Sequence, residues 1–428
     1  MRLQMKLTGF LAISAFLMSI SAASAEPITL QDAVARALEY DPAIEQAAAN
    51  IERSEAGIDQ ALAKRRPTAG IRGELGLLET DFTADTISQI PRSVGLQAEW
   101  TVFSSGATNA AIDASQFQRD AAARQLLSSR ERIALNTFEA YARTWLAEQV
   151  TVVAKARVDT LSTRLEETNS RFEQGLVTRT DIALTEARLA SAEAQYEAAR
   201  AGVAAARAQL ARLTGETRPE PIGPASFSYP DIGSLDAMLG RVLTNNPDLA
   251  AAQSALSSAD ARVKEASAQF GPKVSVRARA THGEDMFFFF EDPISDIGAF
   301  VTVEMPLYTG GMKQAAARGS IASKSLATAQ LRQVRLQLTQ ATTSLWENIS
   351  ARRLALNAAQ RAEAAASLAA EGSLKEYDAG LRTLVDTLDA ENEYRDAELQ
   401  SLRAETELRI AEAQLLSLSS ELEAALLP

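Results

Sequence analysis

The amino-acid sequence predicts a mainly α-helical protein with a small β part, assembled from two tandem copies of one unit. Three observations indicate this class. Similar residues recur at a constant offset of 205 positions along most of the chain. Each copy contains a pair of short stretches in which polar and apolar residues alternate, which is typical of strands. Each copy also contains helical stretches far longer than those of an ordinary globular domain.

The repeat keeps one register from its first predicted helix to its last. The matching pairs are Leu30/Leu235, Arg36/Arg241, Leu38/Leu243, Pro42/Pro247, Pro67/Pro272, Arg72/Arg277, Glu99/Glu304, Gly106/Gly311, Gly175/Gly380, Thr178/Thr383, Asp181/Asp386 and Glu186/Glu391. Because the register is constant, both copies should hold the same elements at the same lengths. The first copy is expected at residues 26–213 and the second at 235–428. The linker between them, residues 214–234, carries four prolines, which exclude a continuous helix.

Residues 1–25 are expected to be a signal peptide rather than part of the fold. Arg2 and Lys6 precede an apolar run, and small residues at 23–25 fit a cleavage site. The chain has no cysteine, which excludes a disulfide framework and lipid attachment at a cysteine. Loss of the two cations would take the formal net charge from −12 to −14, and an acidic chain argues against a nucleic-acid partner. No later stretch is apolar enough for a transmembrane helix.

Each copy is expected to begin with a helix, residues 29–66 in the first copy, and to continue with two strands. The strands are predicted at 68–80 and 92–104, and at 272–284 and 296–308 in the second copy, because polar and apolar residues alternate there. An ordinary antiparallel sheet on a core is one interpretation. The other is a sheet that crosses a membrane, since strands of about ten residues do so when tilted. Four strands cannot close a barrel, so several chains would then have to contribute strands.

The rest of each copy is predicted to be one long helix followed by a shorter one. The long helices span 106–174 and 311–378, and the shorter ones span 178–213 and 383–420. At about 1.5 Å per residue, each long helix would reach roughly 100 Å, so the two shorter helices of a copy, stacked end to end, would match it. Apolar residues recur every seven positions beside a stripe of alanines, which predicts antiparallel coiled coils.

The last helix of each copy has an acidic start. Thr178 with Asp181, and Thr383 with Asp386, fit the pattern in which a threonine and an acid three residues later cap a helix. The glycine before each threonine fits the turn that ends a long helix. Capping does not account for Asp389, which follows Asp386 on the same helix face. If several chains surround an axis, these two aspartates would form carboxylate rings that select cations.

The run Gly-Leu-Arg-Thr-Leu-Val-Asp-Thr-Leu-Asp-Ala at 380–390, together with Glu304–Gly311 and the duplicated halves, resembles the TolC-type outer-membrane efflux and secretion proteins. The resemblance covers essentially the whole chain after residue 25. It implies a homotrimer in which four strands per chain form one 12-stranded β-barrel, continued by a long antiparallel α-helical coiled-coil barrel. It also implies a location among the lipids of the outer membrane of a Gram-negative bacterium. The helices would then project into the periplasm, with the linker in an equatorial belt.

The resemblance further implies a gate at the ends of the helical hairpins. Asp386 and Asp389 match entrance aspartates of the family. Tyr377 and Arg382 match groups that hold the entrance closed by linking to the neighbouring coil. The groups of that coil are Thr180 and Asp181.

The function expected from this resemblance is a passive exit duct opened by an iris-like movement of the hairpins. A periplasmic adaptor protein and an inner-membrane transporter, either ABC-type or proton-driven, would act with it, in type I protein secretion or in multidrug efflux. The alternative from another class is a periplasmic coiled-coil spacer without channel activity. The tips expected to contact the adaptor are Gly175, Leu176, Gly380 and Leu381.

No enzymatic activity, cofactor or resident metal is expected. The chain has one histidine, His282, no cysteine and no phosphate-binding glycine motif. Multivalent cations are expected only as blockers at Asp386 and Asp389. The segment Met286–Phe290 is expected in an external loop as an aromatic cluster at the membrane interface, and a receptor site for phage or toxin is the alternative.

Overall fold

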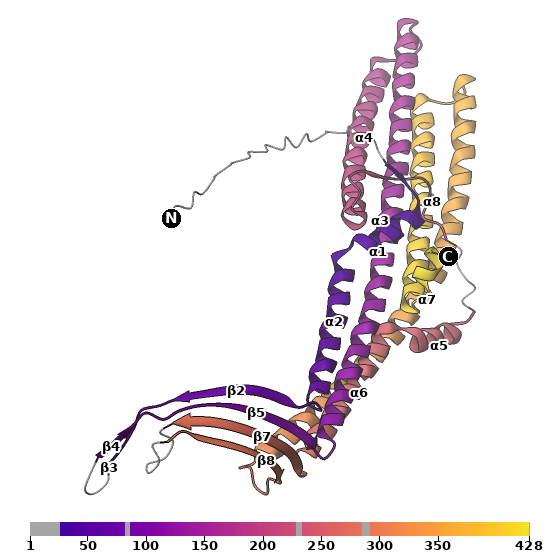
Figure 1. Ribbon diagram of the computed structural model, residues 1–428. Helices are drawn as coiled ribbons and strands as arrows, with labels where there is room; N and C mark the ends of the chain where they lie inside the picture. The colour runs from indigo at the N-terminus through magenta and orange to yellow at the C-terminus, as the bar shows by residue number, and fades with distance from the viewer. Residues whose placement is uncertain (1–25, 82–85, 228–232, 285–291, 428) are drawn as a thin grey trace, which may run out of the picture.

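The computed structural model describes residues 26–81, 86–227, 233–284 and 292–427, which form a long, mainly helical molecule. Figure 1 shows a curved β-sheet at one end and the ends of two helical hairpins at the other, with the C-terminus between them. The predicted signal peptide, residues 1–25, and the predicted aromatic loop, Met286–Phe290, lie outside the described residues.

The described residues of the first copy form four helices, and the first part of the copy departs from prediction. They are α1 (Leu30–Tyr40), α2 (Pro42–Ala63), α3 (Ala107–Glu173) and α4 (Arg179–Thr214). A single helix over 29–66 is therefore wrong. Asp41, which separates α1 from α2, has an extended backbone (φ −70°, ψ 123°), and its carboxylate accepts the Ala43 N–H at 2.9 Å. Pro42 causes the break, because a proline restricts the residue before it and has no N–H to donate.

The second copy repeats this arrangement and adds one short helix. Its helices are α5 (Leu235–Asn245), α6 (Pro247–Ala268), α7 (Met312–Asp378), α8 (Leu384–Leu418) and α9 (Leu422–Leu426). The same break occurs before Pro247, where the side chain of Asn246 accepts the Leu249 N–H at 2.9 Å. Among the described residues, none of the helices combines the length and the apolar character needed to cross a membrane.

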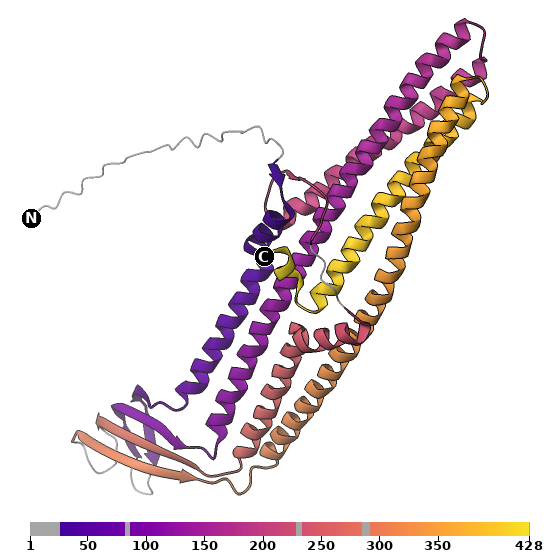
Figure 2. The same cartoon turned by 90° about the vertical axis from the view of Figure 1, so that its right-hand side faces the viewer.

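The helices pack as two long rods, each flanked by two shorter helices. α2 and α4 both contact α3, and α6 and α8 both contact α7. Figures 1 and 2 show the shorter helices one above the other alongside each rod. α3 and α7 have 67 residues each, which corresponds to about 100 Å. Contacts of α3 with α6 and α8 join the two copies side by side.

The main sheet has four antiparallel strands in the order β2-β5-β7-β8, so the two copies share one sheet. The strands are β2 (Thr68–Leu75), β5 (Arg92–Phe103), β7 (Lys273–Glu284) and β8 (Ile294–Glu304). The strand predicted over 68–80 is interrupted: β2 stops opposite Arg92, and β3 (Leu78–Asp81) pairs with β4 (Thr86–Gln89) as a separate hairpin. Pro91 accounts for the interruption, because it has no N–H with which to continue the ladder.

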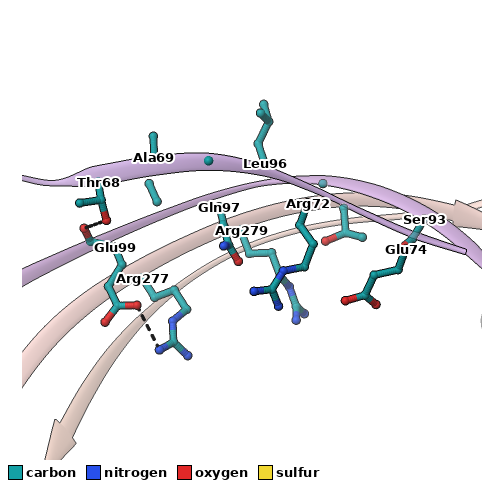
Figure 3. A pocket seen from close by; sticks show the side chains of 14 residues that line it. Thr68, Ala69, Arg72, Glu74, Ser93, Leu96, Gln97, Glu99, Arg277 and Arg279 are labelled. Atoms are coloured by element: carbon teal, nitrogen blue, oxygen red, sulfur yellow. Dashed lines mark hydrogen bonds and ion pairs between the residues drawn. The ribbon is translucent and has the colours of Figure 1, made fainter.

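The two faces of the main sheet differ in polarity. Ile71, Leu96 and Ile297 lie in one cross-strand row on the first face, and their side chains are exposed. The alternate residues of the same strands include Arg72 and Glu99, which Figure 3 shows on the opposite side of the sheet from Leu96. The predicted alternation thus gives one apolar face and one charged face.

The largest core lies midway along the rods. A short strand, β1 (Glu26–Ile28), pairs in parallel with β6 (Pro219–Pro221) of the linker, a pairing that the sequence did not predict. Phe138 of α3 has no exposed surface, and its ring meets that of Phe227 edge-on at 5.4 Å. The surrounding buried side chains come from both copies and include Ile28, Tyr141, Leu210, Leu213, Met238, Val242, Leu415, Leu416 and Leu422. This belt fixes the linker and the C-terminal segment against the rods.

Candidate functional site

The two hairpins end in turns of the same geometry. Two residues after α3 and α7 end, Gly175 and Gly380 have φ angles of 73° and 77°. No atom lies within 4 Å of a Cβ added at either position, so the left-handed backbone rather than lack of space favours glycine. The following N–H groups, of Leu176 and Leu381, donate to carbonyls five residues back at 2.9 Å and 2.8 Å. Both leucine side chains project into solvent, at 69% and 80% exposed.

Two of the predicted gate aspartates, Asp181 and Asp386, bond to the threonine that caps the start of their helix. The Asp181 carboxylate accepts the Thr178 N–H at 2.8 Å, while the Thr178 hydroxyl accepts the Asp181 N–H at 3.4 Å. In the second copy, the Thr383 hydroxyl donates to Asp386 Oδ2 at 2.7 Å and accepts the Asp386 N–H at 3.2 Å. The first copy thus has a full capping box, which satisfies two backbone donors of the helix start, whereas in the second copy only Thr383 satisfies such a donor. The Asp386 side chain stays exposed, so capping leaves its charge open to solvent.

Asp389 forms an ion pair that the sequence did not predict. Arg188 extends from α4 to α8, and its Nη2 lies 2.7 Å from Asp389 Oδ1. The arginine side chain is 22% exposed and the aspartate side chain 61%. Nη1 of Arg188 is buried and has no hydrogen-bond partner among the described residues. Asp389 is therefore not a bare carboxylate in this conformation, because an arginine of the first copy balances its charge.

Tyr377 and Arg382 are engaged within the chain. Tyr377 is 6% exposed, and the guanidinium carbon of Arg171 lies 4.4 Å from the centre of its ring. The Nε of Arg382 lies 2.8 Å from a carboxylate oxygen of Glu376. Within the described residues, neither side chain bonds to the predicted acceptors. The link to Thr180 and Asp181 thus remains a prediction.

Three contacts, which we term the cross-hairpin contacts, connect the α3–α4 hairpin with the α7–α8 hairpin. They are Arg171 with Tyr377, Arg188 with Asp389, and Arg157 with Asp396, where Nη1 and Oδ1 lie 3.6 Å apart. In each contact the first hairpin supplies an arginine and the second supplies its partner. A small apolar cluster packs beside them, formed by Leu161, Ala192, Tyr377, Leu384 and Leu388. These contacts lie toward the hairpin tips, and the packing of α8 against α3 nearer the central belt joins the same hairpins, where Gln414 Nε2 donates to Glu139 Oε1 at 2.8 Å.

A buried carboxylate anchors the C-terminal segment in the central belt. Glu131 of α3 is 6% exposed; its Oε1 accepts the Ser420 hydroxyl at 3.3 Å, and Oε2 has no partner among the described residues. Burial raises the pKa of Glu131 from 4.5 to about 7, although hydrogen bonds from Ser420 and from the N–H groups of Glu423 and Leu422 lower it. Glu423 also pairs with Arg130, whose Nε lies 3.0 Å from its carboxylate. The start of α9 is thus held to α3 by charged and polar groups.

The internal duplication also appears in the comparison with known protein families. The family described as outer membrane efflux protein matches the chain twice, over residues 33–216 and 238–420. The chain belongs to this outer membrane efflux protein family. The two matches lie on either side of the Pro-rich linker, and together they cover more than half of the chain.

Named relatives of this efflux protein are distant in sequence. Outer membrane efflux protein BepC of Brucella suis biovar 1 (strain 1330) is 25% identical over 306 residues, which cover 70% of this chain and 66% of BepC, slightly less than two thirds. Outer membrane protein TolC of Escherichia coli (strain K12) is 23% identical over 366 residues, which cover 82% of this chain and 73% of TolC. The predicted resemblance and the predicted location in the outer membrane of a Gram-negative bacterium are confirmed.

Solved structures show that the efflux protein shares its fold with outer membrane channels. The outer-membrane channel OprN superposes with a TM-score of 0.80 at 21% identity, over 92% of this chain and 90% of OprN. The outer membrane protein VceC of Vibrio cholerae superposes with a TM-score of 0.76 at 21% identity, over 91% of this chain and 96% of VceC. The predicted fold class, mainly helical with a small β part and of TolC type, is confirmed. The match assigns the chain to a family described as outer membrane efflux proteins.

Proposed function

We propose that three copies of this chain form an exit duct for a tripartite export pump. Each copy contributes four strands to a 12-stranded barrel in the outer membrane and two hairpins to a helical tunnel in the periplasm. A periplasmic adaptor and an inner-membrane transporter complete the pump. The duct supplies a path for cargo, and the transporter supplies the energy.

The unfinished sheet is the observation that carries this proposal. β2 and β8 are the edges of the four-stranded order, and neither has a partner on its outer side among the described residues. Ile71, Leu96 and Val301 on the apolar face are 76%, 60% and 71% exposed. Lipid does not tolerate open strand edges. Pairing β8 of one copy with β2 of the next would keep every pair antiparallel and leave no edge in a closed ring.

The charged face of the sheet would then line a lumen, and the apolar face would contact lipid. This orientation agrees with the alternation expected of a barrel with a wet interior. The rods of about 100 Å that continue from the sheet are long enough to serve as a tunnel rather than as a compact domain.

The hairpin tips are the proposed docking points of the adaptor. Leu176 and Leu381 offer exposed apolar side chains on turns held by the same backbone bonds. An adaptor that binds there could move the second hairpin outward, as an iris opens, and break the cross-hairpin contacts. The two ion pairs among these contacts are partly exposed and weak, which suits a latch that a partner opens. The cargo would be a protein if the transporter is an ABC exporter of type I secretion, and a drug if it is a proton-driven pump.

Planar-bilayer recording with the purified chain tests the duct. The wild type should insert, conduct weakly while closed, prefer cations and be blocked by hexamminecobalt(III). The double variant Asp386→Asn with Asp389→Asn should lose both cation preference and block, because the entrance carboxylates are removed. Wild-type protein that never conducts would contradict the duct and support the coiled-coil spacer. Selectivity and block that survive the double substitution would contradict the position of the gate only.

A further inference from the structure

The charged face of the sheet contains an open groove of about 630 Å³ across β2, β5 and β7. Glycines form much of its floor. At Gly95 an added Cβ would lie 3.0 Å from the Ala280 carbonyl oxygen and 3.1 Å from the Thr281 hydroxyl, so the neighbouring strand leaves little room for a side chain. Gly70 also belongs to this floor, opposite Gln97 of β5. Because these glycines have no side chains, long side chains from β2 and β7 have space above the floor.

Three arginines from both copies reach into this groove. Arg72 comes from β2, and Arg277 and Arg279 come from β7; Figure 3 shows all three on the same side of the sheet. Nη2 of Arg277 lies 3.4 Å from Glu99 Oε2, and Nη2 of Arg279 lies 2.9 Å from Asp296 Oδ2. Arg72 has no carboxylate partner among the described residues. The centre of the groove therefore keeps at least one guanidinium whose charge is not balanced.

Neutral hydrogen-bond donors surround the unbalanced guanidinium. In the strand register, Arg72 and Thr281 flank Gly95, and Gln97 lies one row further along β5 opposite Arg279. The Thr281 hydroxyl and the Gln97 amide can both donate. Asp296 of β8 lies in the same row as Arg72, beyond Thr281, but its carboxylate pairs with Arg279. Glu74 lies in the adjacent row on the same face. A ligand beside Arg72 would thus have the Thr281 hydroxyl and the Gln97 amide as further donors.

We propose that this groove binds the anionic group, a carboxylate or a phosphate, of an exported solute. A guanidinium presents paired N–H donors that match the two oxygens of such a group, and donors of the neighbouring strands would hold the remaining oxygens. The inference rests on the proposed function, since the charged face lines a lumen only in the closed ring. Three grooves would surround that lumen. Anionic groups that pass the acidic entrance would meet them on the way out.

Tripolyphosphate is a suitable probe in single-channel recordings of the full chain at low ionic strength, where charge is least screened. Added to each compartment in turn, it should reduce the wild-type current in a saturable way. The double variant Arg72→Gln with Arg279→Gln should raise the apparent dissociation constant at least about tenfold, because two charged donors are lost. Arg92→Gln is the matched control. Arg92 belongs to the same sheet and pairs with Glu284, but the alternation along β5 places it on the opposite face from Ser93.

Variants that fail to fold do not affect the result, because recordings count only inserted channels. Block by hexamminecobalt(III) that equals the wild-type block shows that the entrance of a variant is intact. Unchanged tripolyphosphate block in the double variant, or an equal loss in Arg92→Gln, would overturn the groove while leaving the duct intact. A wild-type current that tripolyphosphate does not reduce would overturn it as well. A wild type without conductance would instead overturn the proposed function itself.

Discussion

Replacing Arg188 with glutamine should favour the open entrance, because it removes one cross-hairpin contact from each copy. The pair with Asp389 is partly exposed, at 22% and 61%, so it should contribute about 0.5 kcal/mol, within the range of exposed ion pairs. Three such pairs in the proposed trimer amount to about 1.5 kcal/mol if they break together. That free energy corresponds to roughly a tenfold increase in the ratio of open to closed channels.

Single-channel recording measures this ratio, and block by hexamminecobalt(III) in the same recordings separates the roles of the two partners. Arg188→Gln should bind the blocker more tightly than wild type, since Asp389 no longer has a cation beside it. Asp389→Asn breaks the same contact from the other side. It should also favour opening, but it should weaken the block.

Arg200→Gln is the matched control for charge. Arg200 lies on the same helix, α4, and pairs with Glu197 of that helix at 2.9 Å, so its loss breaks no contact between hairpins. Conductance and block should stay at the wild-type level. If Arg188→Gln also stays at that level, the ion pair does not hold the hairpins together and the reasoning is wrong.

Three further changes have defined expected results. Tyr377→Phe combined with Arg382→Ser should raise the closed-state conductance in bilayers, and no change would place the latch elsewhere. Glu131→Gln should flatten the pH dependence of thermal stability. Burial raises the pKa of Glu131 from 4.5 to about 7. The protonated carboxyl therefore contributes its full stabilisation of the fold below pH 4.5, and this stabilisation, at most about 3 kcal/mol, is lost as pH rises through 7. Calorimetry between about pH 5 and 8 checks this, and a variant with the wild-type slope would contradict it. Leu381→Ser should weaken adaptor binding about tenfold in a pull-down titration, because it removes an exposed apolar contact; undiminished binding would exclude the tip.

The long helices could be predicted because their signals are local and repeated. Helix α3 spans Ala107–Glu173 where 106–174 was expected, and its copy α7 begins and ends at matching positions. The break at Asp41 was missed because a proline is compatible with the first turn of a helix, so the apolar pattern continues on both sides. The pairing of β1 with β6 could not be predicted, since strands of three residues show no alternation.

The candidate site also combines features that the sequence predicts with features that it does not. The bonds of Asp181 and Asp386 with a threonine three residues earlier could be predicted, because the sequence contains the whole pattern. The capping box that the pattern predicts forms fully only at Asp181. The pair of Arg188 with Asp389 joins helices of different copies. A heptad pattern indicates which face of a helix is buried but not how two hairpins are rotated relative to each other. Complementary charges near the starts of α4 and α8 were the only available signal.

The central claim is that one chain supplies only a third of a closed sheet. Native mass spectrometry of the protein, purified in detergent from outer membranes, tests this most directly. The account predicts a complex with the mass of three processed chains. A stable single chain, with β2 and β8 left as edges, would contradict it.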